Sequence, residues 1–126
     1  MRVTPLEFEK LVRETTDKVL ASLPAELRDR AAEVSVVIAD RATRAQIDGA
    51  GGGDDDLLGL YEGVNLVERR VGDMETVADR ITLFRVPLME SCRTTEELRE
   101  EIRITLLHEL GHYFGFEEND LEERGL

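Results

Sequence analysis

The sequence predicts a single α+β domain in which a small mixed sheet of about three to four strands packs on helices. Two long segments carry apolar residues at helical spacing, three short apolar runs resemble strands, and a glycine-rich stretch separates two of those runs. The chain has 126 residues, which is one domain's worth, so residues 1–126 are expected to form one unit. A chain of this size buries a real core without disulfides or a structural metal.

The N-terminal segment predicts a helix that begins at a threonine cap. Thr4 precedes Pro5, which suits the first helical position, and Glu7 stands where a capping box places its acidic residue. Apolar residues then recur at helical spacing until Pro24, and a short helix is predicted over residues 24–32.

The last long helix is predicted to begin at Thr94, which is again followed three residues later by a glutamate. Gly115 is expected to end it, because glycine adopts the left-handed conformation that closes many helices. The apolar stripe between these two positions consists of Leu98, Ile102, Leu106, Leu110 and Tyr113.

Short apolar runs between the helices predict the sheet. Residues 34–39 are mostly β-branched and too few for a buried helix, which favours a strand covered on both faces. Residues 81–86 predict a strand that ends at the following proline, and residues 57–61 predict another. Residues 64–71 fit either a ragged hairpin or a loop. Residues 40–56, rich in glycine and aspartate, predict a mobile loop because they bury little apolar surface.

The charge and the cysteine content restrict the classes of partner and the cellular compartment that are expected for this chain. The net charge is −12, from 28 acidic and 16 basic residues, so the surface repels nucleic-acid phosphates and anionic lipid. Cationic peptides or metal ions suit it better. Cys92 is the only cysteine and forms no intrachain disulfide, and no segment has the apolar length of a leader or a membrane span. These features predict a cytoplasmic protein without nucleic-acid or membrane partners.

The chemistry is expected at His108, Glu109 and His112, which form an HExxH motif late in the last helix. Residues four apart lie one turn apart on one helix face, so the two imidazoles can bind one zinc ion at about 2.0–2.1 Å each. Glu109 is displaced around the helix and suits a general base. The chain has only two histidines, and both fall in the motif.

A third protein ligand is needed, because a catalytic zinc site has three ligands and one water. The bend expected at Gly115 turns the chain back toward the two histidines. Glu118 stands ten positions after His108, the spacing at which the HExxHxxGxxH pattern has its third histidine. Glu118 is therefore the predicted ligand, with Glu117 and Asp120 as alternatives.

The chain resembles the small bacterial zincin-like metallopeptidases. The resemblance rests on LGLYEG at residues 58–63, DRITLFR at residues 79–85 and HELGHYFG at residues 108–115, and it covers about the last two-thirds of the chain. It implies a compact minimal zincin core, with the zinc helix under a small sheet, and a peptidase activity. The family usually has aspartate at the position of Glu118, so the ligand distance or denticity is expected to differ.

The expected reaction is hydrolysis of a peptide bond by water that zinc activates, with Glu109 moving the proton to the leaving amine. Only eight residues (126 minus 118) follow Glu118, so the site is expected to be shallow. An extended peptide would pair with an exposed strand edge, either residues 81–86 or residues 57–61. The oxyanion would be stabilised by one of three candidates, namely Tyr61, Arg80 or Tyr113.

Three other functions remain open from the sequence. The first is a zinc-binding regulatory or partner-binding protein of the same fold without peptidase activity, because a fold does not fix an activity. The second is another zinc hydrolase, such as an amidase or a nuclease, of which the nuclease is disfavoured by the negative charge. The third is a structural domain without metal. An N/O ligand set also accepts divalent ions other than zinc.

Overall fold

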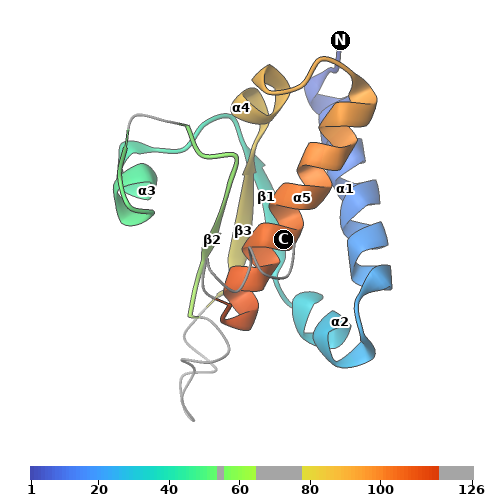
Figure 1. Ribbon diagram of the computed structural model, residues 1–126, viewed down its shortest axis with the longest axis vertical. Helices are drawn as coiled ribbons and strands as arrows, with labels where there is room; N and C mark the ends of the chain where they lie inside the picture. The colour runs from blue at the N-terminus through green and yellow to red at the C-terminus, as the bar shows by residue number, and fades with distance from the viewer. Residues whose placement is uncertain (54–55, 65–77, 117–126) are drawn as a thin grey trace.

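The computed structural model describes residues 1–53, 56–64 and 78–116, and Figure 1 shows their arrangement. No helix in these ranges is long and apolar enough to cross a membrane. The described residues form five helices and three strands in the order α1 (Pro5–Ser22), α2 (Ala25–Ala31), β1 (Ser35–Ala39), α3 (Arg44–Gly49), β2 (Gly59–Glu62), β3 (Arg80–Phe84), α4 (Arg85–Glu90) and α5 (Thr95–Phe114). This architecture confirms the predicted α+β class.

Helix α1 begins as the sequence predicts. The Thr4 hydroxyl accepts the Glu7 backbone N–H at 3.1 Å and satisfies one of the donors left open at a helix start. The Glu7 carboxylate accepts the Thr4 hydroxyl rather than its backbone N–H, so only half of the capping box forms. Leu23 caps the C-terminal end in an extended conformation, and α2 begins directly after Pro24.

Helix α3 corrects the prediction of a loop throughout residues 40–56. The Thr43 hydroxyl accepts the Gln46 backbone N–H, and the Gln46 side chain accepts the Thr43 backbone N–H, which makes a complete capping box. This local pairing supports a short helix whose residues bury no side chain. Apolar patterning alone cannot reveal such a helix.

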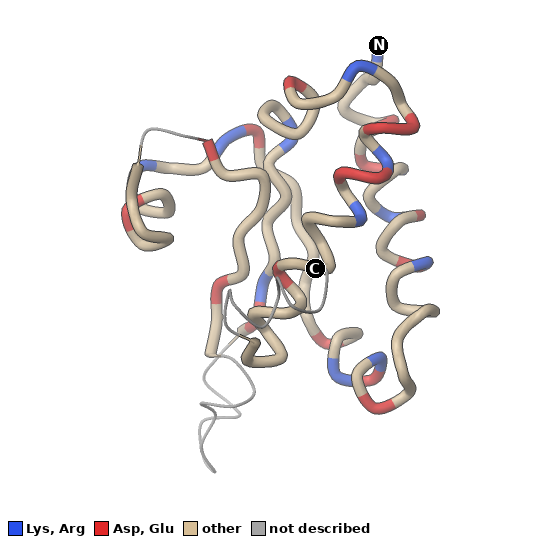
Figure 2. Tube along the Cα trace, viewed as in Figure 1, with Lys and Arg blue, Asp and Glu red and all other residues tan. Residues whose placement is uncertain are grey.

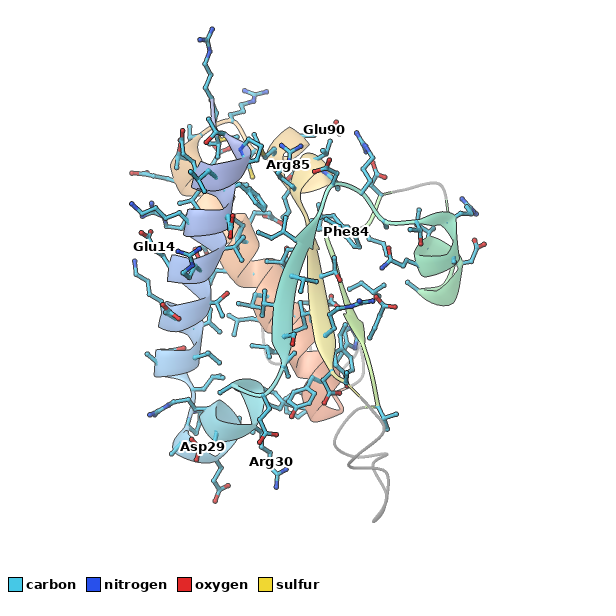
Figure 3. All side chains as sticks on the ribbon, turned by 180° about the vertical axis from the view of Figure 1, so that it is seen from behind. Glu14, Asp29, Arg30, Phe84, Arg85 and Glu90 are labelled. Carbon is cyan, nitrogen blue, oxygen red and sulfur yellow. The ribbon has the colours of Figure 1, made fainter. Side chains whose placement is uncertain are left out.

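The three strands form a mixed sheet with β3 in its centre. The order is β1-β3-β2, with β1 parallel and β2 antiparallel to β3. The strand predicted over residues 81–86 ends earlier, at Phe84, where α4 begins (Figure 3). Pro87 lies in the first turn of α4, where its missing N–H needs no helical partner. Of the ambiguous residues 64–71, all except Val64 lie outside the described ranges.

Helix α5 lies between α1 and the sheet and contacts both (Figure 1). Gly115 closes it with φ 95°, in the left-handed region that glycine adopts without strain. Every residue of the predicted apolar stripe is buried, as are Ile81, Leu83 and Phe84 of the central strand. Charged residues occur mainly along the helices, whereas the strands carry few (Figure 2). The core therefore forms where α1, α5 and β3 meet, and α5 is rigidly supported along its length.

Candidate metal centre

The C-terminal half of α5 brings together the two imidazoles and one carboxylate. The rings of His108 and His112 have centroids 5.0 Å apart and lie at 79° to each other. One ligand atom from each of His108, Glu109 and His112 lies within 4.8 Å of the others. Both histidines are half-buried and Glu109 is buried. Neither imidazole is fully buried in the core, as the helical spacing predicted.

This donor set fits a zinc ion. Two nitrogens bound to one tetrahedral ion at about 2.0–2.1 Å lie roughly 3.4 Å apart, which small rotations of adjacent imidazoles achieve. Both rings are half-buried, so each keeps an exposed part that a metal ion can reach. Nitrogen and oxygen ligands of this kind also suit other divalent metals, whose binding depends on geometry and supply.

The carboxylate of Glu109 is held by the edge of the sheet. Its Oε1 accepts the backbone N–H of Tyr61 in β2 at 2.8 Å. The Phe84 backbone N–H donates to the Leu58 carbonyl, and the alternation of an antiparallel ladder then directs the Tyr61 N–H away from β3. The Tyr61 N–H, which points away from β3, therefore fixes the orientation of the Glu109 carboxylate next to the two imidazoles.

Gly59 allows α5 to approach β2 closely enough for that contact. A Cβ atom at Gly59 would lie 2.6 Å from Cγ2 of Thr105 and 3.3 Å from the carbonyl oxygen of Thr82. Thr105 is buried one helical turn before Glu109. Gly59 is thus a site-forming residue to which sequence analysis gave no such role. The available signal was a glycine inside a strand, which often marks the close approach of another segment.

A groove of about 250 Å³ opens beside the site, between the start of β2 and the exposed face of α5. It is smaller than most ligand pockets, which range over about 300–1,000 Å³. Within the described ranges, this agrees with the shallow site that the sequence led us to expect. Its lining comprises Leu58, Gly59, Glu101, Ile104, Thr105, His108 and Glu109.

The three residues predicted as oxyanion stabilisers all have other partners. The hydroxyl of Tyr113 donates to the backbone carbonyl of Arg30 in α2 at 3.2 Å, and the side chain is buried in the core. The Tyr61 hydroxyl donates to Asp79 at 2.6 Å, and Arg80 forms an ion pair with Glu62 at 3.2 Å. Of the three candidates, Tyr113 is the least suited to the role, because the apolar stripe of α5 turns its ring into the core.

The expected peptide-binding edge also needs correction. Residues 81–86 cannot offer a free edge, because β3 pairs with a strand on each side. The alternative, residues 57–61, overlaps β2, which is at an edge of the sheet formed by the described residues and borders the groove. The strand order, which no local pattern encodes, decides between the two.

The chain turns after α5 in the manner predicted. The Gly115 and Phe116 backbone N–H groups bond back to carbonyls of the last turn, Phe116 to Gly111 at 2.9 Å. The predicted third ligand Glu118 and its alternatives Glu117 and Asp120 lie outside the described ranges. The ligand assignment beyond the two histidines therefore stays a prediction.

Comparison with known families adds one match. The sequence model described as "Zincin-like metallopeptidase" matches residues 31–126, a span that contains the whole sheet, α5 and the two histidines. The comparison with curated proteins yields no match.

Proposed function

The chain belongs to the zincin-like metallopeptidase family, and we propose that it is a zinc-dependent peptidase. In this proposal His108 and His112 hold one zinc ion and Glu109 is the general base. The observation that supports it most is the convergence of the three ligand atoms within 4.8 Å, with the carboxylate anchored to Tyr61. A purely structural helix has no need to place two imidazoles and a buried carboxylate together.

When bound, zinc supplies a Lewis acid that polarises the scissile carbonyl and lowers the pKa of water toward about 7. Glu109 takes the proton of the attacking water and delivers it to the leaving amine. The hydrogen bond from Tyr61 keeps the carboxylate on the sheet side of the helix during both transfers. The short groove leaves most of a peptide outside the site, so β2 must supply part of the binding surface.

We assign the third ligand to Glu118, with Glu117 and Asp120 as the alternatives. The left-handed turn at Gly115 supports this assignment, since the Phe116 N–H already bonds back to the Gly111 carbonyl at 2.9 Å. Replacing Glu118 with alanine should weaken zinc binding by at least about tenfold, as removal of a ligand does. Unchanged zinc affinity would transfer the role to Glu117 or Asp120, which the same substitution tests in turn.

The central experiment separates metal binding from catalysis. Zinc content is measured by mass spectrometry, and cleavage of a random peptide mixture is followed for the wild type and Glu109→Gln. The variant should retain zinc and lose turnover by about 10²–10⁴-fold, the usual contribution of a general base. Glu96→Gln, an exposed position on the same helix, is the matched control and should change neither. Undiminished turnover of Glu109→Gln would remove Glu109 from its role.

A second candidate is a zinc-binding regulatory or partner-binding protein without peptidase activity. The small volume of the groove favours it, because peptidases enclose several substrate residues. It predicts full zinc occupancy and no cleavage of any peptide in the mixture. The cytoplasmic location remains a prediction from the composition, and the peptide substrate remains a prediction from the HExxH motif and the family.

A further inference from the structure

Glu101 occupies the far end of the groove that begins at His108. The two residues are seven positions apart on α5, which places them on the same face and about 10 Å apart along the helix axis. Glu101 is half-buried, and it lines the same cavity as His108 and Glu109. A ligand group in this groove therefore meets the metal site at one end and a carboxylate at the other.

Two glutamates near Glu101 on α5, Glu97 and Glu100, have partners that Glu101 does not share. Glu97 accepts the backbone N–H of Arg93 at 2.8 Å, and Glu100 accepts the Nε–H of Arg103 at 2.9 Å. Across residues 1–53, 56–64 and 78–116, the Glu101 carboxylate forms neither an ion pair nor a hydrogen bond. A half-buried carboxylate without a partner gains most when a cation arrives.

The walls of the groove are apolar between its two ends. Ile104 is 41% exposed, more than any other large apolar residue of α5, and its side chain lines this groove together with Leu58. No lysine or arginine is among the lining residues of the described chain. Lysine and arginine bury an aliphatic stem against such walls and keep their charged end for a carboxylate.

We infer that this groove, defined by Leu58, Ile104 and Glu101, is a specificity site for a Lys or Arg side chain of the substrate. The inference rests on the proposed function and deepens it by naming a substrate class. The basic side chain belongs to a residue next to the scissile bond. Its stem lies on Ile104 and Leu58, and its cation binds Glu101.

The dimensions agree with this placement. Glu101 is about 10 Å from His108 along the axis. A long basic side chain that starts beside the scissile bond, followed by one charged hydrogen bond of about 2.8 Å, spans that distance. A short side chain leaves the carboxylate unpaired. The net charge of −12 draws cationic peptides toward the protein as a whole, and Glu101 then selects the register.

A binding experiment tests the inference independently of catalysis. Zinc-loaded Glu109→Gln protein is titrated with fluorescent, alanine-rich heptapeptides that carry one lysine at each position in turn, and with matched glutamine peptides. Lysine at one position should bind about five- to tenfold tighter than glutamine, the scale of a hydrogen-bonded charged pair. Adding Glu101→Gln should abolish that preference, and adding Glu101→Lys should reverse it for a glutamate peptide.

The control variant lies on the same helix as Glu101. Adding Glu96→Gln removes an equal charge from an exposed position and should leave the preference unchanged. Equal binding of lysine and glutamine peptides at every position, or a preference that survives Glu101→Gln, would overturn the inference. Cleavage by the wild type, assayed on the same peptides, tests the proposed function separately: absence of cleavage with an intact Glu101-dependent preference would refute the peptidase and keep the specificity site.

Discussion

Helices α1 and α5 are similar in construction and different in use. Each begins at a threonine whose hydroxyl accepts a backbone N–H three residues later at 3.1 Å, and the two pack against each other. Helix α1 buries a single stripe against the core, and Thr15 is the polar member of that stripe. Helix α5 buries its apolar stripe and also two polar residues, Thr105 and Glu109, that face β2. One helix of this small domain thus serves the core and the candidate site at once.

The difference shows how one helix can connect such a site to the core. The buried stripe of α5 packs against α1 and β3, and His108 and Glu109 lie on the same helix. Tyr61 and Gly59 then fix the distance between α5 and the sheet edge. Substitutions in α1 should therefore change stability, whereas substitutions where α5 meets β2 should change the site.

The largest effect on stability is expected from Phe8→Ala in α1. Phe8 is fully buried, and loss of such a ring costs about 3–5 kcal/mol of unfolding free energy. Urea denaturation measures this cost, and zinc titration of the folded protein should give the wild-type affinity. A clear loss of zinc affinity in the folded variant would show that α1 takes part in the site and would remove the contrast between the helices.

Gly59→Ala should affect both stability and the site. The added methyl group meets Thr105 at 2.6 Å, so α5 and β2 must separate at a cost of about 1–3 kcal/mol. Separation stretches the bond from Tyr61 to Glu109, and peptide turnover should fall more than zinc affinity. Gly49→Ala is the matched control, because nothing lies within 4 Å of its added Cβ. Equal behaviour of the two variants would contradict the close approach.

Gly115→Ala should have an intermediate effect at the end of α5. An L-residue at φ 95° costs about 1–2 kcal/mol, and relaxation of the turn redirects the chain that leads to Glu118. Thermal unfolding and zinc titration should both weaken. Asparagine at this position tolerates the left-handed conformation better and should recover part of each loss. Wild-type zinc affinity in Gly115→Ala would show that the turn does not position a ligand.

The smallest effect is expected for the exposed pair of Glu100 and Arg103. Hydrogen bonding from Arg103 lowers the pKa of the Glu100 carboxyl below its usual value. The pair therefore adds stability above the ordinary glutamate pKa, and this contribution disappears as the pH falls through the lowered value. An NMR titration should show the lowered pKa in the wild type and its return toward the usual range in Arg103→Gln. Zinc binding should be unaffected.

The local sequence was sufficient to predict where α5 begins and ends and which of its faces is buried. The Thr94 cap, the buried stripe, the end at Gly115 and the spacing of the two histidines all involve residues within one helix. Interactions between positions three or four apart follow from helical geometry, so the convergence of the imidazoles could be predicted. Helix α4 could not be predicted from its local sequence, because Pro87 is equally compatible with the end of a strand and the first turn of a helix.

The placement of the sheet against α5 was decided only by the tertiary structure. Tyr61 and Glu109 are 48 residues apart, and no periodicity links a strand-edge N–H to a helix carboxylate. The same holds for the central position of β3, the contact of Gly59 with Thr105 and the groove that joins Glu101 to His108. These features depend on which surfaces meet when the core closes, and that is a property of packing over the whole chain rather than of any one segment.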